Sequence, residues 1–192
     1  MRKPNCKPLH AGQVLREFAK CFKDKENRVR YPYAMIDRDT IIATDSRVIL
    51  KCTHHMPIID GTAYVKLDHA ARFSTNDDLI LDGEHLQGTA SGLIVPAHRE
   101  PVKLFESVKG LFDREQSSFI DNPEPVSCFW ISSELLSNVA GVFDRLGFDN
   151  VELHFNTSSR PMTIEALRTH CQSGSNATAV LEGMIMHRRR DD

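Results

Sequence analysis

Short apolar segments separated by tight turns fill residues 33–98, and this pattern limits the fold more than any other feature of the chain. Residues 79–81 and 85–87 flank the trio Asp82-Gly83-Glu84, and a polar trio at 37–39 joins two more apolar segments. An Asp-Gly pair between alternating segments favours a hairpin, because glycine tolerates the positive φ of a tight turn. The sequence therefore predicts antiparallel β-hairpins.

Amphipathic helices are predicted on either side of these strands. Residues 11–23, 102–113 and 132–146 each place apolar side chains at helical spacing. A capping serine, Ser132 or Ser133, and Gly147 mark the ends of the last helix. With a short helix between the strands and more strand-like sequence beyond residue 150, the order of elements predicts an α+β fold.

Bulk properties point to an ordinary intracellular protein. The net charge of -2 does not indicate any class of binding partner, although it allows a local basic patch. We expect no membrane span, because no apolar run approaches the ~18 to 20 residues that crossing a bilayer needs. The start lacks the apolar core of an export signal, and five cysteines at scattered spacing suggest free thiols. A cytoplasmic location is expected.

A basic stripe runs along the first helix. Arg16, Lys20 and Lys23 fall close together on the face opposite Val14 and Phe18, at about 100° per residue. Such charges commonly make up a solvated helix face. The alternative is a surface that faces phosphate groups. The spacing alone leaves both interpretations open.

Catalytic and metal-binding signatures are absent from the sequence. It contains no Gly-rich phosphate loop, no GxSxG and no HExxH motif. Cys52 with His54 and His55, and the pair His170-Cys171, lack the separations typical of zinc ligands. Turn chemistry accounts for the loop aspartates. We therefore expect no catalytic residue, no metal and no cofactor, and a non-enzymatic protein.

One segment resembles a known family. Residues 42–50, Ile-Ala-Thr-Asp-Ser-Arg-Val-Ile-Leu, are similar to the Ala-Thr-Asp-Gly-His-Arg-Leu motif of the bacterial DNA sliding clamp, the β subunit of the replicative polymerase. Ala43, Thr44 and Asp45 match, Ser46 replaces the glycine, and Arg47 stands at the family's histidine or, with a gap, its arginine. Residues 183–188 are similar to the family's closing Met-Pro-Met-Arg-Leu, without the proline.

The resemblance implies an α+β, DNA-clamp-like fold, with repeated units of short antiparallel β-sheets and helices on one face. Residues 63–98 and 128–187 both fit the order strand, helix, strand, turn, strand, strand, which predicts the repeat. Residues 1–98 would form a first clamp-like domain and residues 99–192 a second, shortened one. Two-domain clamps close into rings as trimers, so a homo-oligomer is expected.

In the family, helices line a hole that encircles duplex DNA and contact its backbone without reading sequence. By resemblance, Arg16, Lys20 and Lys23 would make these contacts. A DNA polymerase or other replication protein would insert a short peptide into a cleft. That cleft would use six residues: Thr44, Ser46, Arg47, Ile49, Met184 and Met186. The two methionines fit ordinary strand core equally well.

The function implied is a DNA sliding clamp or clamp-like processivity factor that tethers replication proteins. Two other functions stay open. One is a non-ring interaction module with the clamp fold, which binds replication proteins or DNA. The other is an α+β enzyme whose site the sequence does not display. Arg188, Arg189 and Arg190 form either a solvated tail or a further DNA contact.

Overall fold

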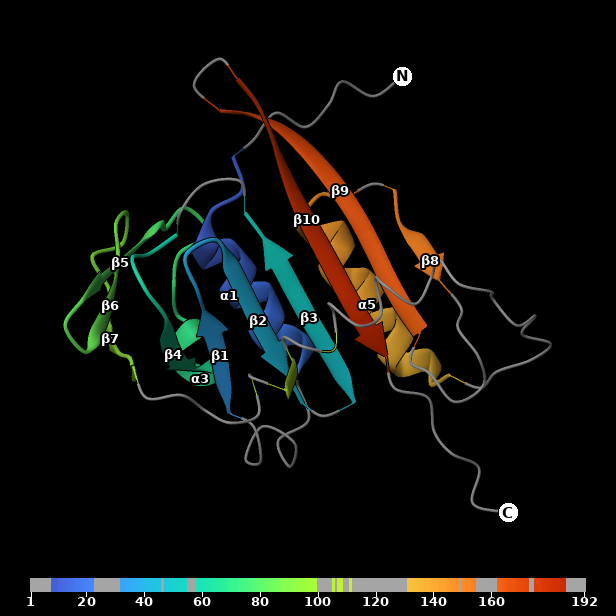
Figure 1. The fold of residues 1–192 in the computed structure, drawn as a ribbon, viewed down its shortest axis with the longest axis horizontal. Coiled ribbons are helices and arrows are strands. Elements are labelled where there is room, and N and C mark those ends of the chain that lie inside the picture. Colours follow the sequence, from blue (N-terminus) through green and yellow to red (C-terminus); the bar gives the residue numbers. More distant parts are fainter. Residues whose placement is uncertain are drawn as a thin grey trace.

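A seven-stranded antiparallel sheet lies at the centre of the fold (Figure 1). The structure, a computed structural model, describes residues 8–22, 32–45, 47–54, 58–99, 105, 107–108, 111, 131–148, 150–154, 162–172 and 175–185, with only the backbone of 168–172 and 175–178. In spatial order the strands are β4 (Ala63–Lys66), β1 (Tyr33–Ile36), β2 (Thr40–Thr44), β3 (Val48–Thr53), β10 (Ser175–Ile185), β9 (Met162–Gln172) and β8 (Glu152–His154).

The sheet joins the two ends of the sequence. β3 pairs with β10, with Ile49 opposite Met184 and Lys51 opposite Glu182. Helix α1 (Ala11–Cys21) precedes β1, β2 and β3, and helix α5 (Ser133–Arg145) precedes β8, β9 and β10. The strand order is therefore symmetric about the β3–β10 pair, with β4 added at one end.

The repeat predicted for residues 63–98 and 128–187 is not confirmed. Residues 63–98 contain β4, the short helix α3 (Leu67–Ala70) and a separate three-stranded sheet, whereas the unit beginning at α5 matches the unit beginning at α1. The difference arises because β4 pairs with β1, in a register set by Tyr64 and Met35, and so belongs to the large sheet. The division into two domains at residue 98 stays a prediction.

Helices α1 and α5 pack on one face of the large sheet (Figure 1). On α1, Val14, Leu15 and Phe18 are fully buried, and on α5 Val139 and Phe143 join the same core. Each such side chain contributes about 1.5–3 kcal/mol through removal from water. Helix α3 lies against α1 on the side away from α5, so α1 is the more enclosed of the two long helices.

The ends of the helices largely match the predicted ones. Ser132 caps α5, since its hydroxyl oxygen accepts a hydrogen bond from the amide of Leu135 at 3.4 Å, and Gly147 beyond the last turn has a φ of 76°. Helix α1 ends at Cys21 rather than residue 23. Of the predicted helix 102–113, the structure describes residues 105, 107, 108 and 111, all with helical backbone.

A second apolar cluster lies on the other face of the large sheet. Its sheet members are Met35, Ile42, Ile49, Tyr64 and Met184, and Phe105 and Val108 cover them. Alternation along the strands separates the two clusters, because neighbouring side chains point to opposite faces. Leu50, for example, belongs to the main core, whereas Ile49 belongs to the second cluster.

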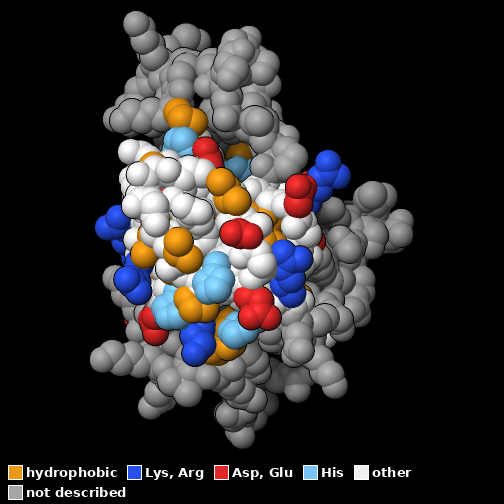
Figure 2. All heavy atoms as spheres, turned by 90° about the vertical axis from the view of Figure 1, so that its left-hand side faces the viewer, with side chains coloured by type: hydrophobic (Ala, Val, Ile, Leu, Met, Phe, Trp, Pro, Cys, Tyr) orange, Lys and Arg blue, Asp and Glu red, His pale blue; other side chains and the backbone are white. Residues whose placement is uncertain are grey.

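The smaller sheet consists of β5 (Leu79–Asp82), β6 (His85–Gly88) and β7 (Ile94–Pro96). Asp82 and His85 are paired across Gly83, whose φ is 57°, which confirms the predicted Asp-Gly hairpin. Leu86 and Val95 face the core. Figure 2 shows this end of the molecule, where apolar side chains, histidines and charges of both signs are intermixed. The fold is thus α+β with antiparallel sheets and a few helices, as predicted.

Candidate functional site

The helix layer carries part of the predicted basic stripe. Arg16 is half-buried and Lys20 is exposed on α1, whereas Lys23 lies outside the described residues. The structure adds a cation that the stripe did not include. Arg145, at the end of α5, lies beside α1, and its backbone oxygen accepts a hydrogen bond from the Gln13 side chain at 3.3 Å. We call the three cations Arg16, Lys20 and Arg145 the helix face.

A buried carboxylate joins the two helices. Glu17 on α1 accepts a hydrogen bond from Lys20 Nζ at 2.6 Å and another from Arg145 Nε. Burial by itself would raise the pKa of Glu17, but the hydrogen bonds and charges of Lys20 and Arg145 outweigh it and hold the pKa below its ordinary value. Glu17 therefore stays ionised and ties α1 to α5.

The pattern of basic residues on α1 does not reveal this carboxylate. Glu17 and Lys20 are three residues apart, a spacing typical of ion pairs on a helix, which was the available signal. Glu17 offsets one of the three positive charges on the helix face, and α5 also carries two exposed negative charges, Glu134 in its first turn and Asp144 in its last. The positive surface is therefore small and local.

The residues that match the clamp motif form the β2–β3 turn. Asp45 Oδ1 accepts hydrogen bonds from the amides of Arg47 and Val48, both at 2.9 Å. The buried hydroxyl of Thr44 donates to the carbonyl of Val48 at 2.8 Å. An aspartate that bonds the backbone two residues later is typical of turn chemistry. Thr44 and Asp45 thus hold the hairpin, and the Arg47 side chain is exposed at its tip.

The predicted cleft residues are brought together in part. Thr44, Ile49 and Met184 occupy one row across β2, β3 and β10. Ser46 and Met186 lie outside the described residues. Ile49 and Met184 are buried in the second cluster beneath Phe105 and Val108. The row predicted from the resemblance therefore exists, but a segment of the same chain covers its apolar part.

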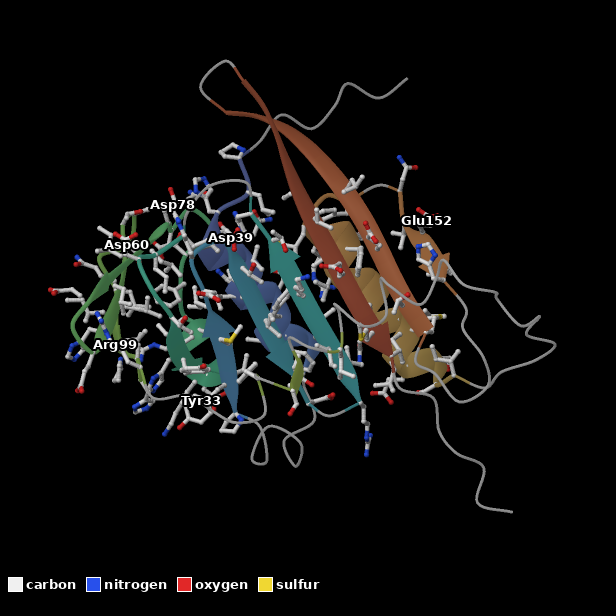
Figure 3. All side chains as sticks on the ribbon, in the orientation of Figure 1. Tyr33, Asp39, Asp60, Asp78, Arg99 and Glu152 are labelled. Atoms are coloured by element: carbon white, nitrogen blue, oxygen red, sulfur yellow. The ribbon has the colours of Figure 1, made fainter. Side chains whose placement is uncertain are left out.

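A charged row lies beside this apolar surface. Lys51 and Glu182 are paired at 2.7 Å across β3 and β10, and the register continues to Glu165 on β9 and Glu152 on β8. Glu152 marks the β8 edge, at the opposite end of the molecule from Arg99 (Figure 3). Three carboxylates and one ammonium group thus face the same side as the second cluster. No sequence pattern indicated this row, because it depends on pairing between distant strands.

Asp77 is a fully buried carboxylate with a structural role. It accepts hydrogen bonds from the amides of Ser74, Ala90 and Ser91 and from the Ser91 hydroxyl, at 2.7–3.0 Å. Burial would raise the pKa of Asp77, but these donors outweigh it and lower the pKa. At Gly88, a Cβ would lie 2.6 Å from the carboxyl carbon, so only glycine fits there. With four donors in place, Asp77 links two loops.

The described part of the chain contains no group of three or more His, Cys, Asp or Glu side chains placed to hold a metal ion. Of the residues considered for a metal in the sequence, Cys52 and His54 are buried, and the side chains of His55, His170 and Cys171 lie outside the described part of the chain. None of the helices within those same residues is long and apolar enough to span a membrane.

Comparisons with known proteins found no relative of this chain. No family model matches the chain, and no curated protein or solved structure matches it. Any functional conclusion therefore rests on the arrangement of the described residues.

Proposed function

We propose that the protein is a DNA sliding clamp or clamp-like processivity factor that encircles duplex DNA and tethers replication proteins. The observation that carries the proposal is the helix layer. α1 and α5 lie side by side on one face of a single antiparallel sheet, and each precedes three strands of it. Their junction presents Arg16, Lys20 and Arg145.

These cations suit contacts with the DNA backbone. Lys20 and Arg145 each use a hydrogen bond on Glu17, but an ammonium group has three N–H donors and a guanidinium has five. Donors therefore remain for phosphate oxygens while Glu17 restricts where the two heads lie. Contacts of this kind depend on salt and ignore base sequence. The mechanism is topological, so no bond is made or broken.

The partner surface of this proposal lies on the second face of the sheet, next to the exposed Arg47 of the β2–β3 turn, since Phe105 and Val108 cover Ile49 and Met184. Helices and partner surface then lie on opposite sides of one sheet. DNA and a tethered polymerase would thus not compete for the same residues.

Retention on DNA tests the proposal directly. The protein, assembled on nicked circular DNA, should stay bound through a high-salt wash and be released when the circle is linearised. Arg16→Ala with Lys20→Ala should lower affinity for duplex DNA and reduce the slope of log K against log salt by about two units. Equal retention on linear and circular DNA would contradict encirclement. An unchanged salt slope would show that the helix face does not contact DNA.

A second candidate is an interaction module with the same fold that forms no ring. The charge balance favours it, since Glu17, Glu134 and Asp144 offset the three cations of the helix face. Solution mass separates the two functions: a single chain at micromolar concentration would favour the module.

A further inference from the structure

Gly141 lies inside α5, one turn before the end of the helix at Arg145. Glycine is less favourable than alanine at such a position, because it loses more backbone entropy and has no side chain to pack. The backbone of Gly141 is helical, and the described glycines with a positive φ, such as Gly147, lie outside the helices. Conformational freedom therefore does not explain this glycine.

The space above Gly141 is filled by a guanidinium group. A Cβ at this position would lie 2.8 Å from Nη1 of Arg145, 3.6 Å from its Cζ and 3.7 Å from its Nη2, and these are the three nearest atoms. Long side chains on a helix lean toward the preceding turn, which brings the Arg145 head over Gly141. A contact of 2.8 Å is too short for a Cβ, so with any other residue at 141 the guanidinium must move.

This place on α5 brings the Arg145 head to α1. Its Nε donates to Oε2 of the buried Glu17, while Lys20 Nζ donates to Oε1 of the same carboxylate at 2.6 Å. The Arg145 side chain is 43% exposed and that of Lys20 is 44% exposed, so both heads also face outward. Arg145 is thus held between the α5 backbone and Glu17, next to a second cation.

We propose that Gly141 is a positioning residue for the DNA contact, because the space above it fixes the Arg145 guanidinium beside Lys20. An arginine side chain loses rotamer freedom when it binds a phosphate group, and a head that is already held loses less. The fixed pair of cations then binds the phosphate backbone as a unit. This inference rests on the proposed function for its ligand, whereas the placement of Arg145 is measured without DNA.

A double-mutant cycle measures the placement. Glu17→Gln, Arg145→Gln and their combination are made in the unsubstituted chain and in Gly141→Ala, and urea unfolding gives the coupling free energy between the two side chains. The coupling should fall at least about twofold in Gly141→Ala, because the added Cβ moves the guanidinium away from Glu17. Equal coupling in the two backgrounds would overturn the proposal.

A salt titration of duplex-DNA binding measures the consequence. Gly141→Ala retains every charge of the helix face, whereas a substitution of Glu17 changes both charge and placement. The slope of log K against log salt should fall by about one unit in Gly141→Ala, as it should in Arg145→Gln. The two substitutions together should be no worse than Arg145→Gln alone, because Gly141 acts through Arg145.

Ser137→Ala is the matched control. Ser137 is exposed on α5 one turn before Gly141, so this substitution also introduces an alanine into the helix but leaves the space under Arg145 unchanged. It should alter neither the coupling nor the salt slope. Since alanine favours a helix, Gly141→Ala should fold, and a purely structural effect of the substitution would change its stability without changing the slope.

The two measurements separate the placement from the DNA contact. Reduced coupling with a reduced slope supports the proposal. Reduced coupling with an unchanged slope would overturn the role of Gly141 in DNA binding. If the unsubstituted chain binds no duplex DNA, the proposed function fails, and reduced coupling would still show that Gly141 positions Arg145.

Discussion

Two aspartates, Asp45 and Asp77, lie in turns and stabilise the fold by accepting hydrogen bonds from backbone amides. Asp45 organises the β2–β3 turn, and Asp77 joins the loop at Ser74 to the turn at Ala90 and Ser91. Turn chemistry was the predicted role of the loop aspartates, and the hydrogen bonds confirm it for these two. The sequence did not predict that Asp77 is buried, because its burial depends on a hairpin more than ten residues away.

Asp77→Asn should lower the free energy of unfolding by about 2–3 kcal/mol at pH 7, because an amide cannot accept from all four donors. Since the folded pKa of Asp77 is depressed, its contribution is fully present above the ordinary value of 3.8 and is lost as the pH falls below it. Urea unfolding of both proteins from pH 7 to pH 3 measures this. Asp78→Asn, an exposed control, should cost under about 0.5 kcal/mol.

Thr44 distinguishes a structural motif from a binding one. Thr44→Val keeps the shape of the side chain and removes its hydrogen bond to the Val48 carbonyl, which still accepts from the Asp45 amide at 3.3 Å. The expected loss is about 1 kcal/mol of stability, measured by urea unfolding. Unchanged stability would show that the hydroxyl does not hold the turn.

At the scale of elements, periodicity predicted what each segment is but not what it contacts. The spacing of Val14, Leu15 and Phe18 predicts an amphipathic helix, and Asp82-Gly83 predicts a hairpin, because both signals are local. The same spacing at Phe105 and Val108 shows that a face must be buried without showing against what. The pairing of β3 with β10 could not be predicted from the sequence either, since residues over a hundred positions apart set its register.

The contact between α1 and α5 can be tested through Glu17. Glu17→Gln should lower stability by about 1–2 kcal/mol, because two charge-assisted hydrogen bonds are weakened. It should also raise affinity for duplex DNA a few-fold at low salt, since the helix face loses its buried negative charge. Urea unfolding and a salt titration of DNA binding measure the two effects.

Glu134→Gln provides the control for this prediction. Glu134 is an exposed carboxylate in the first turn of α5, where it interacts only with the helix dipole, so its substitution should cost under about 0.5 kcal/mol. Unaltered DNA affinity in the Glu17 variant, measured together with the expected loss of stability, would mean that the helix face is structural only.

At the scale of the whole molecule, the large sheet ends in two different edges. β4 is partly covered, since His98 pairs with Tyr64. β8 is three residues long and forms the other end of the sheet among the described residues, with Leu153 exposed on it and Val151 exposed just before it. An open edge with apolar side chains favours pairing with another chain. We propose the β8 edge as the contact for the homo-oligomer predicted from the sequence.

Leu153→Lys should break this association, because a lysine on an edge strand opposes strand pairing. Light scattering at micromolar concentration should show a multiple of the 21.7 kDa chain for the unsubstituted protein, and the variant should need at least about tenfold more protein to reach it. Leu167→Lys is the control, since Leu167 is 61% exposed, against 45% for Leu153, and lies on β9, opposite Val180 of β10 and beyond the residues that pair with β8. A single-chain mass for the unsubstituted protein would argue against a ring, and a loss of mass in both variants would exclude the β8 edge as the specific contact.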